Sequence, residues 1–163
     1  MSETGGLKAA SRRVDAALSA LGVDYEIRTH DSSARSAEEA AATVGCPVGQ
    51  IAKSLIFRSA DGERAVLAIA SGGNRVDEKA LAKLLGEKIG RADADFVRRQ
   101  TGYAIGGVPP LAHAQEPVVF IDRDLMAYET IWAAAGTPNS VVRLQTADLP
   151  RITGGRVADF KTL

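Results

Sequence analysis

A strand predicted near the middle of the chain carries a lysine on its apolar face. Side chains two residues apart on a strand share a face, so Lys53 shares its face with Ile51, Leu55 and Phe57. An ammonium group among apolar side chains is costly unless it has a partner or a function. The alternative is a lysine that reaches solvent from the end of a strand. Lys53 is therefore the first candidate functional residue.

A second segment, Thr101–Leu111, is too rich in glycine and proline to form a regular element. Glycine permits positive φ and a close approach of the backbone to a ligand, and Pro109 and Pro110 stiffen the exit from the segment. We expect a loop of fixed shape with free N–H groups at Gly106 and Gly107. Such a loop suits a carbonyl, a carboxylate or a ribose. The alternative is a tight connection between a helix and a strand.

The rest of the chain mixes hairpins with helical crossovers. Apolar spacing and capping signals predict helices at 7–21, 36–44, 78–85 and 93–99, a helical turn at 122–126 and a short helix from 146. Strands are predicted at 25–29, 51–58, 64–70, 88–91, 117–122, 129–134 and 140–144, with a hairpin turn at Asp61-Gly62. This mixture indicates an α/β or α+β domain around a mixed, curved sheet. A length of 163 residues predicts one domain, 1–163, with its core at about 7–152.

Composition limits the class of protein. There are 20 basic and 20 acidic side chains, which argues against a general nucleic-acid coat protein. A local basic patch could still bind RNA; the alternative is that these charges merely solvate helices. The candidates are Lys8, Arg12, Arg13, Arg98 and Arg99. No apolar run approaches the roughly 20 residues that span a membrane, the N-terminus has no signal-peptide pattern, and the single cysteine excludes an intramolecular disulfide. We expect a cytoplasmic protein without a membrane partner.

Metal chemistry is not expected. His30, His113 and Cys46 show no paired ligand spacing. Cys46 could be a nucleophile, but no histidine is near it in sequence, which favours a structural role. We expect no metal and no cofactor.

Taken together, these motifs resemble the YbaK/prolyl-tRNA synthetase-associated domain family of aminoacyl-tRNA deacylases. The resemblance rests on the segments 45–55, 101–111 and 131–139 and runs from about Leu7 to Ile152. It implies a mixed, barrel-like sheet surrounded by helices. It also implies hydrolysis of the ester that joins a wrong amino acid to the 3′ end of a tRNA. Because the sequence shows no synthetase or anticodon-binding domain, we expect a freestanding trans-editing enzyme.

The resemblance implies roles for six residues. Lys53 would stabilise the ester carbonyl, the terminal ribose or a phosphate electrostatically, although a lysine with a lowered pKa could act as general base. Backbone N–H groups of Gly106 and Gly107 would bind the substrate, in a loop that runs to Pro110 and forms the lip of the pocket. His30 could line the pocket or be a surface histidine. Asn139 could bind substrate, although a Pro-Asn turn is the simpler explanation.

The chain also departs from the cysteine-clearing branch of that family. That branch has serine at the position of Pro109, an acid within the stretch 140–143, and tyrosine at the position of His30. A pocket lined by Val141 and by a wall formed by Pro109 and Pro110 would favour a small, weakly polar amino acid such as alanine. A synthetase or an elongation factor would supply tRNA selectivity. The alternatives are a non-catalytic module that binds aminoacyl-tRNA ends or aminoacyl-nucleotide ligands and, more remotely, a lysine Schiff-base enzyme.

Overall fold

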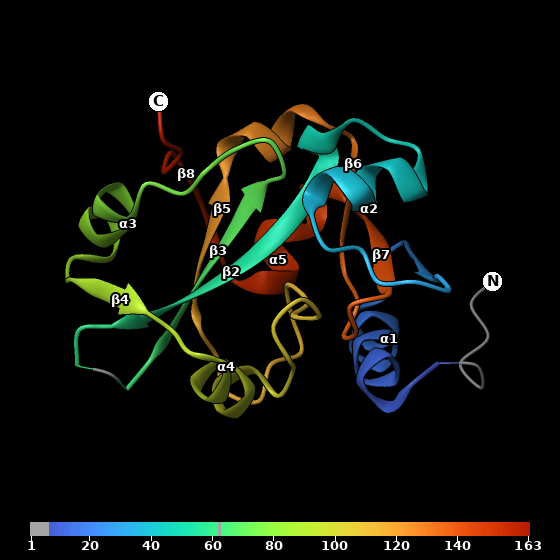
Figure 1. Cartoon of the computed structure of the whole chain (residues 1–163), viewed down its shortest axis with the longest axis horizontal. Coiled ribbons are helices and arrows are strands. Elements are labelled where there is room, and N and C mark those ends of the chain that lie inside the picture. Colours follow the sequence, from blue (N-terminus) through green and yellow to red (C-terminus); the bar gives the residue numbers. More distant parts are fainter. Residues whose placement is uncertain (1–6, 62) are drawn as a thin grey trace.

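The computed structural model describes residues 7–61 and 63–163, and its centre is an eight-stranded mixed sheet (Figure 1). The strands are β1 (Tyr25–Thr29), β2 (Ile51–Ser59), β3 (Ala65–Ser71), β4 (Ile89–Arg91), β5 (Val118–Asp122), β6 (Thr130–Ala134), β7 (Ser140–Gln145) and β8 (Arg156–Ala158). Their order is β1-β7-β6-β2-β3-β5-β8, and β4 pairs with β2 beside this path. The predicted mixed, curved sheet surrounded by helices is confirmed.

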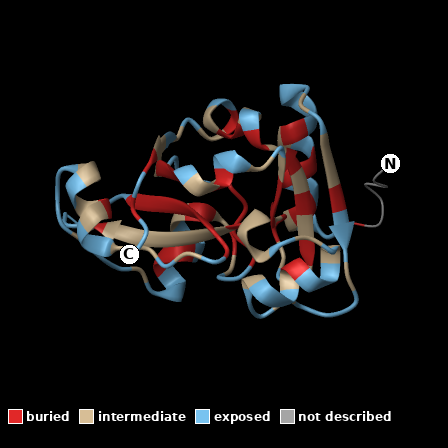
Figure 2. Cartoon of the chain, turned by 90° about the horizontal axis from the view of Figure 1, so that it is seen from above, coloured by how far each residue is buried: buried red, intermediate tan, exposed pale blue. Residues whose placement is uncertain are grey.

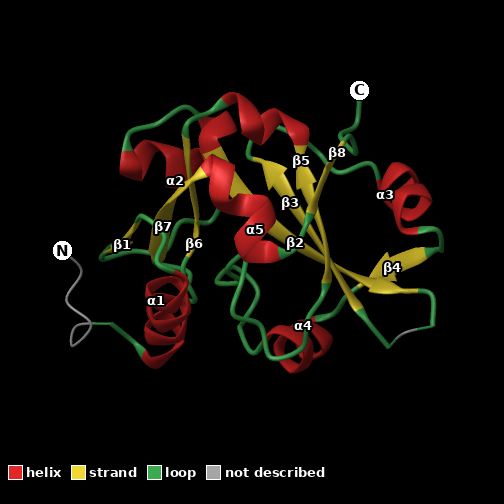
Figure 3. Ribbon diagram, turned by 180° about the vertical axis from the view of Figure 1, so that it is seen from behind, coloured by secondary structure: helices red, strands yellow, loops and turns green. Residues whose placement is uncertain are grey.

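Five α-helices and three 3₁₀ turns surround the sheet in the described part of the chain (Figure 3). The helices are α1 (Ala9–Leu21), α2 (Ala37–Val44), α3 (Glu78–Leu85), α4 (Ala94–Thr101) and α5 (Leu149–Thr153), and the 3₁₀ turns are η2 (Val48–Gln50), η3 (Arg123–Ala127) and η4 (Thr146–Asp148). Ser36 caps α2 by accepting a hydrogen bond from the Glu39 N–H, as the sequence predicted. The Glu39 carboxylate accepts from the N–H of Arg35 instead of Ser36.

The strand that carries the lysine organises the sheet. β2 pairs with β3 along most of its length and with β4 at its far end. Its parallel contact with β6 consists of two residue pairs, Ile51 with Trp132 and Ala52 with Ala133. Beyond Ala52 the sheet therefore divides into two wings, β1-β7-β6 and β2-β3-β5-β8. Lys53 is the first residue of β2 after the wings separate.

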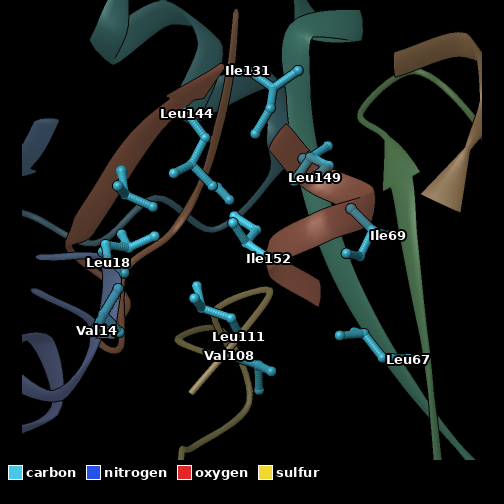
Figure 4. Close-up of a cluster of buried hydrophobic side chains, with 14 of the residues drawn as sticks. Val14, Leu18, Leu67, Ile69, Val108, Leu111, Ile131, Leu144, Leu149 and Ile152 are labelled. Atoms are coloured by element: carbon cyan, nitrogen blue, oxygen red, sulfur yellow. The ribbon is translucent and has the colours of Figure 1, made fainter. Parts of the chain in front are cut away.

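The two faces of the sheet are packed differently. One face is covered by the main core, to which α1, α5 and the glycine-proline loop contribute (Figure 4). The opposite face carries two smaller clusters, one around α3 and one around α2. Figure 2 shows that buried residues concentrate on the central strands, and exposed residues on the loops and the outer sides of the helices. Every residue of β3 is buried, which explains its continuous apolar sequence.

Most predicted elements are confirmed, with boundaries that differ by one or two residues. The final helical segment begins as η4 before α5. The hairpin of β2 and β3 is present, while Gly62 of its predicted turn lies outside the described residues. β8 was not predicted, and buried residues continue past Ile152 to Phe160, which is 1% exposed. No helix among the described residues is long and apolar enough to cross a membrane.

Candidate functional site

Lys53 is half-buried on the α2 face of the sheet. Ile51 belongs to the cluster around α2, and Leu55 packs against the cluster around α3. Lys53 thus lies between two apolar clusters, opposite Ala70 of β3. No hydrogen bond or ion pair joins its ammonium group to any described residue. Because an unpaired cation in an apolar setting attracts negative or dipolar groups strongly, the position suits a ligand that brings such a group.

The loop between α4 and β5 is held rigidly at its start. The Tyr103 hydroxyl donates to the Ala112 carbonyl at 2.9 Å, and the Arg13 guanidinium stacks on the Tyr103 ring at 4.5 Å from its centroid. Ala112 has a φ of 67°, an unusual value for a residue other than glycine. Tyr103 is 1% exposed. The loop is therefore pinned to α1 and to its own exit.

The tip of this loop is a tight turn. The Gly107 N–H donates to the Ala104 carbonyl at 3.0 Å, and Gly106 has a φ of 93°, which favours glycine. The expectation of a free N–H group at Gly107 is therefore wrong, because the turn itself uses that donor. The Gly106 N–H donates to no described residue, and Gly106 is exposed. Of the two predicted donors, Gly106 alone is open to a ligand. Pro110 is buried and fixes the exit of the loop.

The loop packs against the turn between β6 and β7. The Gly136 N–H donates to the Gly107 carbonyl at 2.9 Å. A Cβ atom on Gly107 would lie 2.9 Å from the Gly136 oxygen and 3.0 Å from the Thr137 Cα, so only glycine allows this approach. Pro138 lies 3.9 Å from the position a Gly106 Cβ would take. Two segments far apart in sequence thus form one surface.

Hydrogen bonds of serine hydroxyl groups fix the β6–β7 turn. Ser11 of α1 donates to the Ala135 carbonyl at 2.7 Å and lies 3.1 Å from the Ser140 hydroxyl. The Ser140 hydroxyl accepts from the Thr137 N–H at 3.2 Å. These residues could not be predicted from the sequence, because isolated serines and threonines carry no signal of a contact across 124 positions.

Asn139 links this turn to the end of β1. Its side-chain amide donates to the His30 carbonyl at 2.8 Å and accepts from the Thr137 hydroxyl at 3.0 Å. Its own carbonyl accepts from the His30 N–H at 2.8 Å. The Asn139 side chain therefore donates one hydrogen bond and accepts one within the protein, and it retains a second N–H donor. Asn139 holds His30 in place.

His30 and Asn139 line a small hollow beside α2. Its free volume of about 10 Å³ suits one water-sized group. The lining residues are His30, Ser32, Ala34, Ala40, Thr43, Pro138, Asn139 and Val141. The His30 Nε2 atom is buried and has no hydrogen-bond partner among the described residues. A buried nitrogen without a partner is costly, so this atom is a candidate contact for a ligand.

Pairing relates the hollow to the lysine. Val141 pairs with Ala134, which follows the β6 residues that pair with β2. Val141 also packs against the cluster that contains Ile51. Lys53 and Val141 therefore lie on the same face of the sheet. The structure brings His30 and Asn139 together in the hollow and sets Gly106 beside Pro138, which lines it, while Lys53 lies on the same face of the sheet without lining the hollow.

Two further candidates are His113 and Cys46. His113 lies 2.7 Å from the Pro109 carbonyl, so its neutral ring carries the proton on Nε2. Burial lowers the pKa of His113, while this hydrogen bond opposes the shift. Burial raises the pKa of the Cys46 thiol, which disfavours the nucleophilic thiolate. Within the described residues, no cluster of His, Cys, Asp and Glu could hold a metal ion.

Comparisons with known proteins find a matching family model, a similar protein and similar solved structures. Residues 31–152 match the family model of the aminoacyl-tRNA editing domain. The Bacillus subtilis (strain 168) "Uncharacterized protein YwhH" is 33% identical over 134 residues, which cover 82% of this chain and 85% of that protein. A solved structure named "putative trans-editing enzyme for prolyl tRNA synthetase" is 40% identical over 97% of this chain and all of its own, with a TM-score of 0.90. The solved hypothetical protein APE2540 is 28% identical, over 92% of this chain and 99% of its own, with a TM-score of 0.85.

Proposed function

Because the chain belongs to the aminoacyl-tRNA editing domain family, we propose that it is a trans-editing deacylase, which hydrolyses the ester of a mischarged tRNA. The observation that carries this proposal is Lys53. Lys53 is half-buried between apolar clusters, and its ammonium group has no anionic partner among the described residues, on the face that holds the small hollow. The similarity to a protein named as a trans-editing enzyme supports the same proposal.

The enzyme needs to lower the barrier to hydrolysis only modestly, because an aminoacyl ester is already activated. Water attacks the ester carbonyl carbon, the bond from that carbon to the ribose oxygen breaks, and the ribose oxygen takes up a proton. Negative charge develops on the carbonyl oxygen, where a fixed cation is worth most. Lys53 would supply that charge. The Gly106 N–H, at the rigid tip of its loop, would orient the ester or the ribose.

The hollow sets the size of the amino acid. With a free volume of about 10 Å³, it has room for one methyl-sized group. Val141, Ala40 and Pro138 supply apolar walls, and the buried His30 Nε2 supplies one polar contact. We propose that the substrate side chain is small and weakly polar, such as that of alanine.

Partners follow from this chemistry. The enzyme would bind the aminoacylated 3′ end of a tRNA in the cytoplasm and draw further selectivity from a synthetase or an elongation factor. The similarity to a protein named for prolyl tRNA synthetase makes that synthetase the first partner to test.

A second candidate is a module that binds aminoacyl-tRNA ends or aminoacyl-nucleotide ligands without turnover. One observation favours it: the residues that line the hollow include no carboxylate to accept a proton from an attacking water.

A deacylation panel separates the two candidates. Purified protein is incubated with tRNAs charged with alanine, serine, threonine, cysteine or proline, alongside the Lys53→Ala variant. The deacylase proposal predicts hydrolysis of one or two of these esters and its loss in the variant. Binding of charged tRNA without hydrolysis of any ester would refute turnover and favour the binding module.

A further inference from the structure

Two helices that are far apart in sequence meet at one edge of the molecule. α1 and α4 flank the glycine-proline loop in Figures 1 and 3. Gly102, which ends α4, joins them directly. Its N–H donates to the Arg98 carbonyl at 2.9 Å, and its carbonyl accepts from the Arg13 guanidinium at 3.0 Å. The contact is local to the start of the loop whose tip is Gly106.

This edge is basic. Its exposed cationic side chains, called the α1–α4 basic edge below, are Lys8, Arg12, Arg13, Arg98 and Arg99. Acids offset part of this charge, because Arg99 lines a surface hollow together with Asp61, Glu63 and Glu116. Asp15 of α1 is 7% exposed and accepts a hydrogen bond from Tyr25, and Asp95 pairs with Arg99 at 3.1 Å. Since the formal net charge of the chain is zero, this concentration of cations leaves the rest of the molecule relatively acidic.

The opposite side of the hollow has the other sign. The first turn of α2 exposes Glu38 and Glu39, and Asp31 lies exposed between β1 and α2, with Arg35 as the neighbouring cation. A polyanion whose end enters the site is therefore repelled on the α2 side and attracted on the α1–α4 side. The basic edge continues into the loop whose tip forms the rim of the site.

We propose that the α1–α4 basic edge binds the sugar-phosphate backbone of the tRNA acceptor stem. This inference rests on the proposed function, because the 3′ end must lie at Lys53 while the stem crosses the edge. Arginine and lysine bind phosphates without reading sequence, and each such contact adds to the salt dependence of binding. The edge therefore strengthens tRNA binding and orients the acceptor stem, while a partner protein selects which tRNA is bound.

The test removes charges that contact nothing else. Neither the Lys8 nor the Arg98 side chain bonds to any described residue, so Lys8→Ala with Arg98→Ala leaves the packing intact and retains Arg13, which supports Tyr103. The matched control is Lys79→Ala with Lys83→Ala, which removes two exposed cations from α3. Binding of unfractionated, uncharged tRNA is measured across a salt series for all three proteins.

The edge variant should bind tRNA at least about tenfold more weakly at low salt, and its salt slope should fall by about 0.9 for each phosphate that the variant no longer neutralises. The α3 control should match wild type. Equal weakening in the control, or unchanged binding in the edge variant, overturns the proposal.

A hydrolysis arm separates this inference from the proposed function. Full-length aminoacyl-tRNA is compared with a short aminoacylated oligonucleotide that ends in CCA and lacks the stem. Loss of rate on tRNA alone supports the edge, and equal loss on both substrates overturns it. If wild type hydrolyses neither substrate, the deacylase proposal fails, and the tRNA-binding series still decides on the edge.

Discussion

Replacing Gly107 with alanine tests how the loop and the β6–β7 turn form one surface. The added Cβ would lie 2.9 Å from the Gly136 oxygen, 3.0 Å from the Gly136 carbonyl carbon and 3.0 Å from the Thr137 Cα. All three are backbone atoms, so no side chain can rotate away. The loop must move back, which lengthens the 2.9 Å hydrogen bond from the Gly136 N–H to the Gly107 carbonyl.

The magnitude follows from these two effects. Overpacking of a well-packed site costs about 1–3 kcal/mol, and the weakened hydrogen bond costs about 0.5–1.5 kcal/mol. We expect Gly107→Ala to lower the free energy of unfolding by about 2–4 kcal/mol, or roughly 4–16 °C in Tm for a chain of this size. Circular dichroism during thermal and urea unfolding measures both quantities. Hydrolysis should slow as well, because displacement of the loop moves the Gly106 N–H.

Gly106→Ala is the matched control. Gly106 has a φ of 93°, but its nearest neighbours would be Pro138 side-chain atoms at 3.9 Å, so alanine there meets strain without a clash. Its expected cost is about 1–2 kcal/mol. A Gly107→Ala protein as stable as wild type, with unchanged hydrolysis, would refute the argument that this contact holds the two segments together.

Three further predictions concern one buried and two half-buried polar groups. Asp122 is 2% exposed, and its carboxylate accepts hydrogen bonds from the Ser71 N–H and the Asn74 side-chain amide. Asp122→Ala should therefore lower the free energy of unfolding by about 2–4 kcal/mol. A loss of less than about 1 kcal/mol in a urea titration would contradict this prediction. Asn139→Ala should lower the free energy of unfolding by about 1–2 kcal/mol in the same titration, because the His30 carbonyl loses its hydrogen bond from the Asn139 side chain. An unchanged unfolding midpoint would argue against that hydrogen bond. Burial lowers the pKa of His113 in the fold, so the unfolded chain binds its proton more readily and stability should fall as pH drops below about 6.5. His113→Gln should flatten the dependence of Tm on pH between about 7.5 and 5.5, and an unaltered profile would show that another group is responsible.

The sequence predicted the parts of the site that depend on local pattern. Alternation along β2 placed Lys53 among apolar side chains, and glycine and proline content predicted the loop. The cap at Ser36 followed from a spacing of three residues. In each case the determining interaction lies within one segment.

Contacts between distant segments could not be predicted in this way. The hydrogen bond from Ser11 to Ala135 and the bond from Asn139 to His30 depend on how α1, β1 and β7 pack. The engaged N–H of Gly107 depends on the turn type, which glycine content alone leaves open. β8 was missed because three residues, with burial mainly at Ala158, give too short a pattern for a strand signal.

The central claim is that the unpaired charge of Lys53 stabilises the transition state of ester hydrolysis. The direct measurement is the single-turnover rate with alanine-charged tRNA for wild type, Lys53→Ala and the control Lys83→Ala, all at saturating enzyme. We expect a fall of about 10²–10³-fold in this rate for Lys53→Ala, the size typical of losing one electrostatic stabiliser, and no change for Lys83→Ala. A Lys53→Ala protein that hydrolyses the ester at the wild-type rate would contradict it.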